Sequence, residues 1–258
     1  MDHNMFCFQC EQTAGCTGCT SRGVCGKDAQ TAQVQDRLTG ALIGLARAAD
    51  TSPDAGPETW QLMIEGLFAT LTNVNFDPDS LNALAGRVRA EKQRLVPDGA
   101  VCTAPCGRTG DYDLAQLWGA QEDIRSLKSL LLFGSRGMAA YAYHAMVLGY
   151  RDESVERFLS KALFAVGEAC SMEVLLPLVR EMGEVTLRCM ALLDKANTEC
   201  FGKPSPVHVP FSVEPGPFIV VSGHDLHDLK LLLEQTAGRG IAVYTHGEML
   251  PAHAYPAL

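Results

Sequence analysis

Apolar residues recur every three or four positions along most of the chain, and this pattern limits the fold more than any other feature. Residues Val34, Leu38 and Leu42 begin the first such series, which predicts one buried helical face. The same spacing predicts further helices over roughly 60–71, 81–95, 114–134, 136–148, 152–167 and 172–197. Because the connecting segments are short and polar, we expect about 200 residues to form an antiparallel helical assembly.

Three positions are expected to shape helix ends within this assembly. Asp79 or Ser80 is predicted as the N-cap of the helix that contains Leu81. Gly134 is predicted to end one helix, and Pro177 is expected near the first turn of the last helix or at a kink in it.

The pattern changes at the Pro-rich segment 202–217, which has no helical period. It is followed by FIVVSG, then by the helical stretch HDLHDLKLLLEQTAG, and then by IAVYTHG. This order of strand, helix and strand predicts one βαβ unit of a parallel sheet. We therefore expect a helical domain over residues 1–214 and an incomplete Rossmann-like α/β domain over residues 215–258.

Two strands with one crossover helix make an unfinished parallel sheet, because such sheets normally have several strands with both faces covered. The expected explanation is a truncated polypeptide, or one that another chain completes.

Composition narrows the functional classes. Of the 258 residues 47% are hydrophobic, which is enough for a substantial core, and the net charge of −9 argues against a nucleic-acid surface. The first ten residues lack a secretory signal, and no run of apolar residues is long enough to cross a membrane. We therefore expect a cytoplasmic protein, whose thiols stay reduced.

The N-terminal cysteine loop, residues 5–27, holds five of the ten cysteines. A CxxC pair lets two thiolates reach one metal centre, and nearby glycines let the backbone fold around it. We predict four of these thiolates as ligands of one centre and call them the four loop cysteines; they are Cys7, Cys10, Cys19 and Cys25. Cys16 is left over from a four-ligand site.

Spacing alone does not decide which group these thiolates hold. One cubane iron–sulfur cluster, one structural zinc ion, or free redox-active thiols are all compatible with it. The remaining cysteines have simpler interpretations. Cys102 and Cys106 share a loop without a further ligand cluster, which disfavours a second metal site there. Small buried hydrophobes are the expected role of Cys170, Cys189 and Cys200.

Five segments resemble one family, the hybrid cluster proteins, also called prismane proteins or hydroxylamine reductases. They occur in the family's order and extend over nearly the whole length of the chain. The segments are MFCFQCEQTAGCTGCTSRGVCGK (5–27), LTNVNFD (71–77), GMAAYAYHAMVLGY (137–150), VSGHDLHDLKLLLEQT (221–236) and VYTHGEMLPAHAYP (243–256).

The resemblance implies a 4Fe–4S cubane on the four loop cysteines, and so favours iron over zinc. It also implies a second, hybrid iron–sulfur–oxygen cluster, two of whose ligands match His224 and Glu248. A helical domain made of two packed bundles is implied as well.

Strand geometry supports this pair of residues independently. His224 comes just after the first predicted strand and Glu248 just after the second, so both belong to the carboxyl edge of adjacent parallel strands. Neighbouring strands lie about 4.8 Å apart, close enough for one metal assembly to be shared. The simpler interpretations are a polar residue at a helix N-terminus for His224 and a surface acid for Glu248. Structural or surface roles are expected for His227, His246 and His253.

The activity implied by the resemblance is reduction of hydroxylamine to ammonia and water, with nitric oxide reduction beside it and an external protein as electron donor. Glu248 is a candidate for proton transfer. The family's other hybrid-cluster ligands, several cysteines and a glutamate, come from a carboxyl-terminal half that this sequence lacks, so we expect the chain alone to be inactive.

Two other classes of function remain. The first is a non-catalytic electron-transfer or interaction module that works only with a partner chain, which the unfinished sheet favours. The second is a zinc-stabilised interaction domain, which the thiolate ligands also allow.

Overall fold

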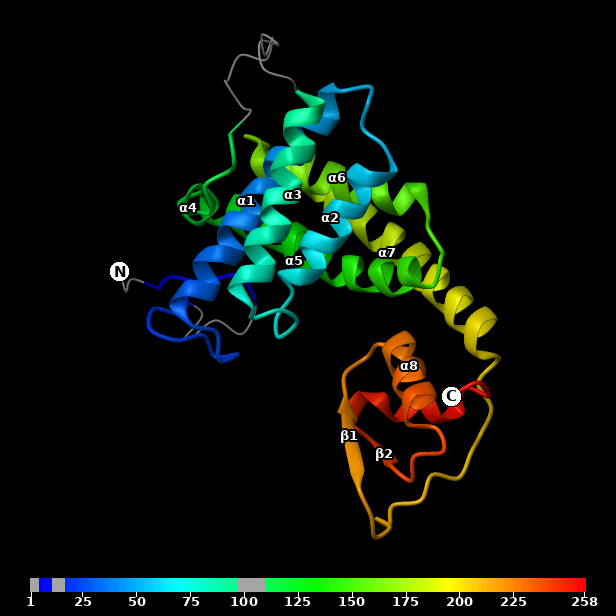
Figure 1. The fold of residues 1–258 in the computed structure, drawn as a ribbon. Coiled ribbons are helices and arrows are strands. Elements are labelled where there is room, and N and C mark those ends of the chain that lie inside the picture. Colours follow the sequence, from blue (N-terminus) through cyan, green and yellow to red (C-terminus); the bar gives the residue numbers. More distant parts are fainter. Residues whose placement is uncertain (1–4, 11–16, 97–109) are drawn as a thin grey trace. The chain divides into compact units, whose positions relative to one another are not determined.

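The computed structural model describes residues 5–10, 17–96 and 110–258 (Figure 1). It confirms the predicted fold class, because the chain is mostly helical and ends in a small parallel βαβ unit. The described elements, in chain order, are α1 (Ala29–Thr51), α2 (Pro57–Ala69), α3 (Pro78–Leu95), α4 (Leu114–Trp118), α5 (Glu122–Val147), α6 (Glu153–Gly167), α7 (Met172–Phe201), β1 (Phe218–Ser222), α8 (Leu226–Thr236), β2 (Ala242–His246) and the 3₁₀-helix η2 (Gly247–Ala254).

Helix α1 is the centre of the helical region. It contacts α2, α3, α4 and α6, and Figure 1 shows α1, α2 and α3 side by side. Leu38 and Leu42 lie on one face of α1 and Ile43 on another, yet all three are fully buried, as expected for a helix enclosed by others. The backbone of Tyr112 comes so close to Gly40 that a Cβ there would overlap the Tyr112 carbonyl oxygen.

The predicted N-cap of α3 was wrong by two or three residues. Asp77, not Asp79 or Ser80, is the N-cap, and its carboxylate accepts a hydrogen bond from the backbone N–H of Asp79 at 3.0 Å. Pro78 follows as the first helical residue, a position where its fixed φ and missing N–H cost nothing.

The predicted helix end at Gly134 was also wrong, because α5 continues through it to Val147. A Cβ on Gly134 would overlap the thioether of Met182 on α7. This glycine therefore allows close packing between two helices instead of ending one. Pro177 lies inside α7, in its second turn.

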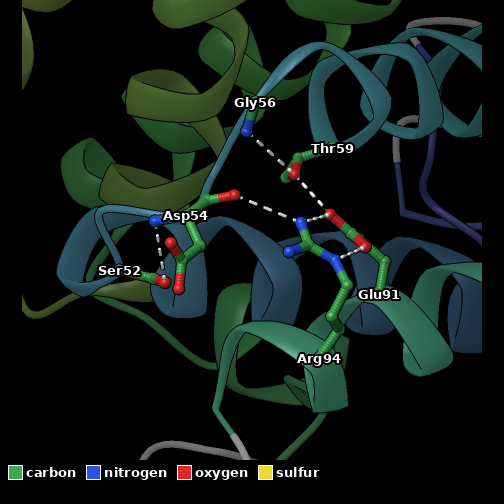
Figure 2. Close-up of polar contacts among 6 residues, drawn as sticks. All are labelled: Ser52, Asp54, Gly56, Thr59, Glu91 and Arg94. Carbon is green, nitrogen blue, oxygen red and sulfur yellow. Dashed lines mark hydrogen bonds and ion pairs between the residues drawn. The ribbon is translucent and has the colours of Figure 1, made fainter.

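A polar cluster joins α2 and α3 to the loop before α2 (Figure 2). Glu91 accepts hydrogen bonds from Thr59 and from Arg94, whose Nε lies 2.7 Å from Glu91 Oε2. Arg94 also donates to the carbonyl of Asp54 at 3.2 Å, and Thr59 Oγ1 accepts from the N–H of Gly56 at 3.3 Å. The hydrogen bond from Arg94 is the main cause that lowers the pKa of Glu91.

The two strands pair in parallel, with Phe218 opposite Ala242 and Ser222 opposite His246. One face of the pair packs against α8 and η2 through a small core that includes Leu229 and Met249. On β1 the residues alternate between partly buried and exposed, and Phe218 and Val220 are 57% and 58% exposed. Apart from an edge-to-face contact between the rings of Phe218 and Tyr244 on β2, these two side chains are thus largely exposed in the described part of the chain.

The chain divides into two compact units, Met1–Tyr143 with Asp152–Cys189, and His144–Arg151 with Met190–Leu258. The predicted domain boundary between residues 214 and 215 stays a prediction, since compact packing does not establish which segments fold independently. Within the described ranges, none of the helices combines the length and apolarity that crossing a membrane requires.

Candidate metal centre

The backbone brings two of the loop cysteines together. Cys7 and Cys19 form an isolated antiparallel bridge, in which the N–H of Cys7 donates to the carbonyl of Cys19 at 3.0 Å and the reverse bond measures 2.8 Å. Such mutually bonded residues lie directly opposite each other, with Cα atoms about 5.5 Å apart. Residues 12 positions apart in sequence thus share one small region.

A tight turn forms the end of the loop. The N–H of Gly23 donates to the carbonyl of Lys27 at 2.8 Å, and the N–H of Gly26 donates to the carbonyl of Gly23 at the same distance. Gly26 has a φ of 92°, which side chains with a Cβ rarely adopt. A Cβ on Gly23 would lie 3.0 Å from the sulfur of Cys25, so this glycine leaves the room that the thiol occupies.

An aromatic cluster holds the start of the loop against α4. The ring of Trp118 lies 5.1 Å from that of Phe6 and 4.8 Å from that of Phe8, measured between centroids. Because these two rings flank Cys7 in sequence, their packing helps to fix the backbone that carries the thiol.

Two cations lie beside the CxxC pair. Lys27 is buried, and its Nζ lies 3.8 Å from the sulfur of Cys7. Arg136 on α5 is also buried and donates to the carbonyl of Gln9, the residue before Cys10, at 2.9 Å. Burial raises the pKa of the Cys7 thiol, and the charge of Lys27 opposes that rise.

Among the four loop cysteines, Cys7 and Cys19 are buried, and Cys10 and Cys25 are half-buried. Among the described residues, no three or more His, Cys, Asp or Glu side chains are placed as a group that could hold a metal ion. The structure therefore brings Cys7 and Cys19 together but does not assemble the four sulfurs at one point. Their joint role as ligands stays a prediction.

Three cysteines outside the N-terminal loop were predicted to be small buried hydrophobes, and their burial differs. Cys189 is fully buried, as expected for a small hydrophobe, whereas Cys170 and Cys200 are only half-buried. Cys16, Cys102 and Cys106 lie outside the described residues.

His224 and Glu248 lie in contact, as strand geometry predicted. Each follows its strand by two residues, and Nε2 of His224 forms a hydrogen bond with Oε2 of Glu248. Both side chains are exposed, by 67% and 74% respectively. The pair thus presents one imidazole and one carboxylate at the carboxyl edge of the sheet, and its role as a metal ligand pair stays a prediction.

Neighbouring side chains form hydrogen bonds at the carboxyl edge of the sheet. Asp225 caps α8 by accepting from the N–H of Asp228 at 3.0 Å, and its Oδ2 lies 3.4 Å from Nδ1 of His144. Burial alone would raise the pKa of Asp225, but the hydrogen bonds from His144 and from the backbone lower it. His246 bonds Ser222 at 3.2 Å.

Sequence reasoning did not single out Lys27, Arg136 or Asp225. A signal for Arg136 was present, because it is the only Lys, Arg, Asp or Glu between Lys128 and Arg151 and stands among glycines and apolar residues. A lone charge in such a helix is typically buried and paired.

Comparison with known proteins identifies the family. The model of the prismane/CO dehydrogenase family matches residues 5–258. The chain belongs to this family. Its relatives include a hydroxylamine reductase of Desulfitobacterium hafniense (strain Y51), 44% identical over 275 residues that cover 98% of this chain and 50% of the relative. A hydroxylamine reductase of Methanosarcina mazei is likewise 44% identical and is covered to 50%, and one of Porphyromonas gingivalis (strain ATCC 33277) is 43% identical.

The chain spans about half the length of these relatives from the prismane/CO dehydrogenase family. The residues near Cys7 fit a thiolate-bound group of negative charge, of the kind that the family name implies. Cys7 and Cys10 carry free thiols, and two buried cations, Lys27 and Arg136, lie beside this CxxC pair. Cysteine thiolates are also the usual ligands of iron–sulfur clusters.

Proposed function

We propose that this chain is the amino-terminal part of an iron–sulfur oxidoreductase that reduces hydroxylamine to ammonia and water, with nitric oxide as a second candidate substrate. The observation that carries the proposal is the contact between His224 and Glu248 at the carboxyl edge of the sheet. It occurs in a chain that aligns over 98% of its length with relatives named hydroxylamine reductase.

In this proposal the four loop cysteines hold a 4Fe–4S cubane, while His224 and Glu248 are ligands of a hybrid iron–sulfur–oxygen cluster. When bound, these groups would supply electrons from an external donor protein and an iron site for the substrate. In this proposal the protein is cytoplasmic, a compartment in which cysteines stay reduced.

Glu248 is the candidate for proton movement. Reduction of hydroxylamine takes up two electrons and two protons, breaks the N–O bond and releases ammonia and water. Glu248 is exposed and bonded to an imidazole, so its carboxyl can take a proton from solvent and donate it to a neighbouring group.

Glu248→Gln in the full-length protein tests this role. In Glu248→Gln protein that keeps both clusters, we expect turnover to fall, because glutamine keeps the shape of the side chain but carries no exchangeable acid proton. Glu234→Gln, at an exposed acid on α8, is the matched control. Normal turnover in Glu248→Gln would exclude the proton-transfer role.

The cubane assignment is tested by counting iron and sulfide in anaerobically purified protein, together with electron paramagnetic resonance. Cys10→Ala should lose the cubane iron, whereas Cys170→Ala, outside the loop, should keep it. Unchanged iron content in Cys10→Ala would contradict the ligand set. Colourless protein that contains zinc would instead establish a zinc-stabilised domain.

A second candidate is a non-catalytic electron-transfer module that needs a partner chain. The exposed apolar side chains of Phe218 and Val220 on β1 favour it, because a parallel sheet is normally covered on both faces.

A further inference from the structure

Arg136 is buried in the middle of α5, with 1% of its surface exposed. Burial lowers the pKa of its guanidinium to about 10, so the group stays charged at neutral pH. Removing such a charge from water costs several kcal/mol unless other charges and hydrogen bonds compensate. Negative charge or hydrogen-bond acceptors near Arg136 must therefore compensate its buried positive charge.

The hydrogen bonds of Arg136 go to neutral acceptors. Nη1 donates to the carbonyl of Gln9 at 2.9 Å, and Nη2 donates to the side-chain carbonyl of the same residue. Nη2 also donates to Thr39 Oγ1 on α1 at 2.9 Å, and Nε to Thr70 Oγ1 after α2 at 3.1 Å. Since Gln9 stands inside the CxxC pair, the planar fork of Arg136 fixes the turn between Cys7 and Cys10.

The nearby charges leave a positive surplus. Lys27 is 5% exposed, and its Nζ lies 3.8 Å from the sulfur of Cys7. Asp36 is the acid whose charge acts most strongly on Arg136, and its buried Oδ1 has no hydrogen-bond partner among the described residues. One carboxylate, that of Asp36, thus interacts with two cations, while the Cys7 thiol lies beside Lys27 and both thiols of the CxxC pair interact electrostatically with Arg136.

We propose that Arg136 and Lys27 are positioning residues that compensate the negative charge of an iron–sulfur cluster at the CxxC pair and thereby raise its reduction potential. The inference rests on the proposed function. A cluster held by thiolates gains negative charge on reduction, and its potential depends on net charge and on nearby charges and hydrogen bonds. Two cations in a low-dielectric environment therefore favour the reduced form.

The test is a redox titration of the full chain, purified anaerobically, followed by electron paramagnetic resonance. Arg136→Met should shift the equilibrium between reduced and oxidised cluster about tenfold toward the oxidised form, which for one electron is about 59 mV. Arg136→Lys keeps the charge but loses the fork, so its potential should stay near that of the wild type while iron is lost faster to a chelator.

Arg47→Met is the matched control, because Arg47 bonds Glu168 and the Gly167 carbonyl, which are distant in sequence from the cysteine loop. It should leave the potential and the spectrum unchanged. If Arg136→Met does not fold, Lys27→Met replaces it in the test, and the same shift toward the oxidised cluster is expected.

The possible results distinguish a failure of the proposed function from a failure of the proposed role of Arg136 and Lys27. A wild-type chain that binds no iron overturns both. A wild-type chain that holds a cluster whose potential is the same in Arg136→Met or, failing that, in Lys27→Met overturns this inference and leaves the proposed function standing.

Discussion

Glu91 shows how a single residue couples folding to pH. Its side chain is buried, and it accepts hydrogen bonds from Thr59 on α2 and from Arg94 on its own helix (Figure 2). These bonds hold the pKa of Glu91 below its ordinary value of 4.5, with the Arg94 bond as the largest cause. The ionised form of Glu91 is therefore favoured by folding.

The sign of the pH dependence follows. Because the pKa is lower in the folded state, the stabilising contribution is present above pH 4.5 and is lost as the pH falls through the folded pKa. Glu91→Gln should lower the free energy of unfolding at pH 7 by roughly 1 kcal/mol. Urea unfolding at several pH values measures this, and a difference that does not shrink in acid would contradict it.

Arg136 and Glu91 differ in what satisfies a buried charge. Glu91 has an ion-pair partner, Arg94, whose Nε lies 2.7 Å away. The bonds of Arg136 end on hydroxyl and carbonyl oxygens instead. The ion pair with Arg94 therefore compensates the buried charge of Glu91. The neutral acceptors around Arg136 leave its charge in need of a further negative group, which we propose lies near Cys7.

Helix α1 depends on close approach at one glycine. Gly40 is enclosed, and its carbonyl accepts a hydrogen bond from the N–H of Tyr112 at 3.0 Å. Gly86 on α3 is exposed, with no heavy atom near the position of a Cβ. Two helical glycines of the same chain thus differ only in their surroundings.

Opposite effects on stability are expected from the same substitution. Gly40→Ala should destabilise the fold by about 1–3 kcal/mol, because the new methyl group overlaps a backbone carbonyl that cannot move freely. Gly86→Ala should stabilise it by about 0.5–1 kcal/mol, since alanine loses less entropy in a helix. Chemical denaturation of both variants measures the difference, and equal changes in stability would show that α1 does not need this glycine.

At the scale of the whole molecule, this chain holds two of the proposed ligands of the hybrid cluster. His224 and Glu248 lie at the end of a two-stranded sheet, and the chain covers about half of each relative. A cluster with only one imidazole and one carboxylate would leave most of its irons without protein ligands.

We therefore expect no turnover of hydroxylamine by this chain alone with a chemically reduced dye as electron donor. The full-length hydroxylamine reductase of Desulfitobacterium hafniense is the positive control in the same assay. Ammonia production is the measurement. Activity of the chain alone would mean that its residues complete a catalytic site, and would also eliminate the electron-transfer module.

Local sequence patterns predicted the helical regions, although not the division between α4 and α5, together with the order of strand, helix and strand and the nearness of His224 to Glu248. These depend on residues a few positions apart, or on the rule that adjacent parallel strands end at one edge. The structure confirmed them through α1–α8, β1 and β2 and the contact between the two side chains.

Tertiary structure alone decided what Gly134 and Arg136 do. Gly134 looked like a helix end, but Met182, 48 positions later, fills the space that its missing side chain leaves. Arg136 reaches Gln9, Thr39 and Thr70, the first of them 127 positions away. Such contacts depend on how whole helices pack, and local patterns carry no information about which distant residue a side chain will meet.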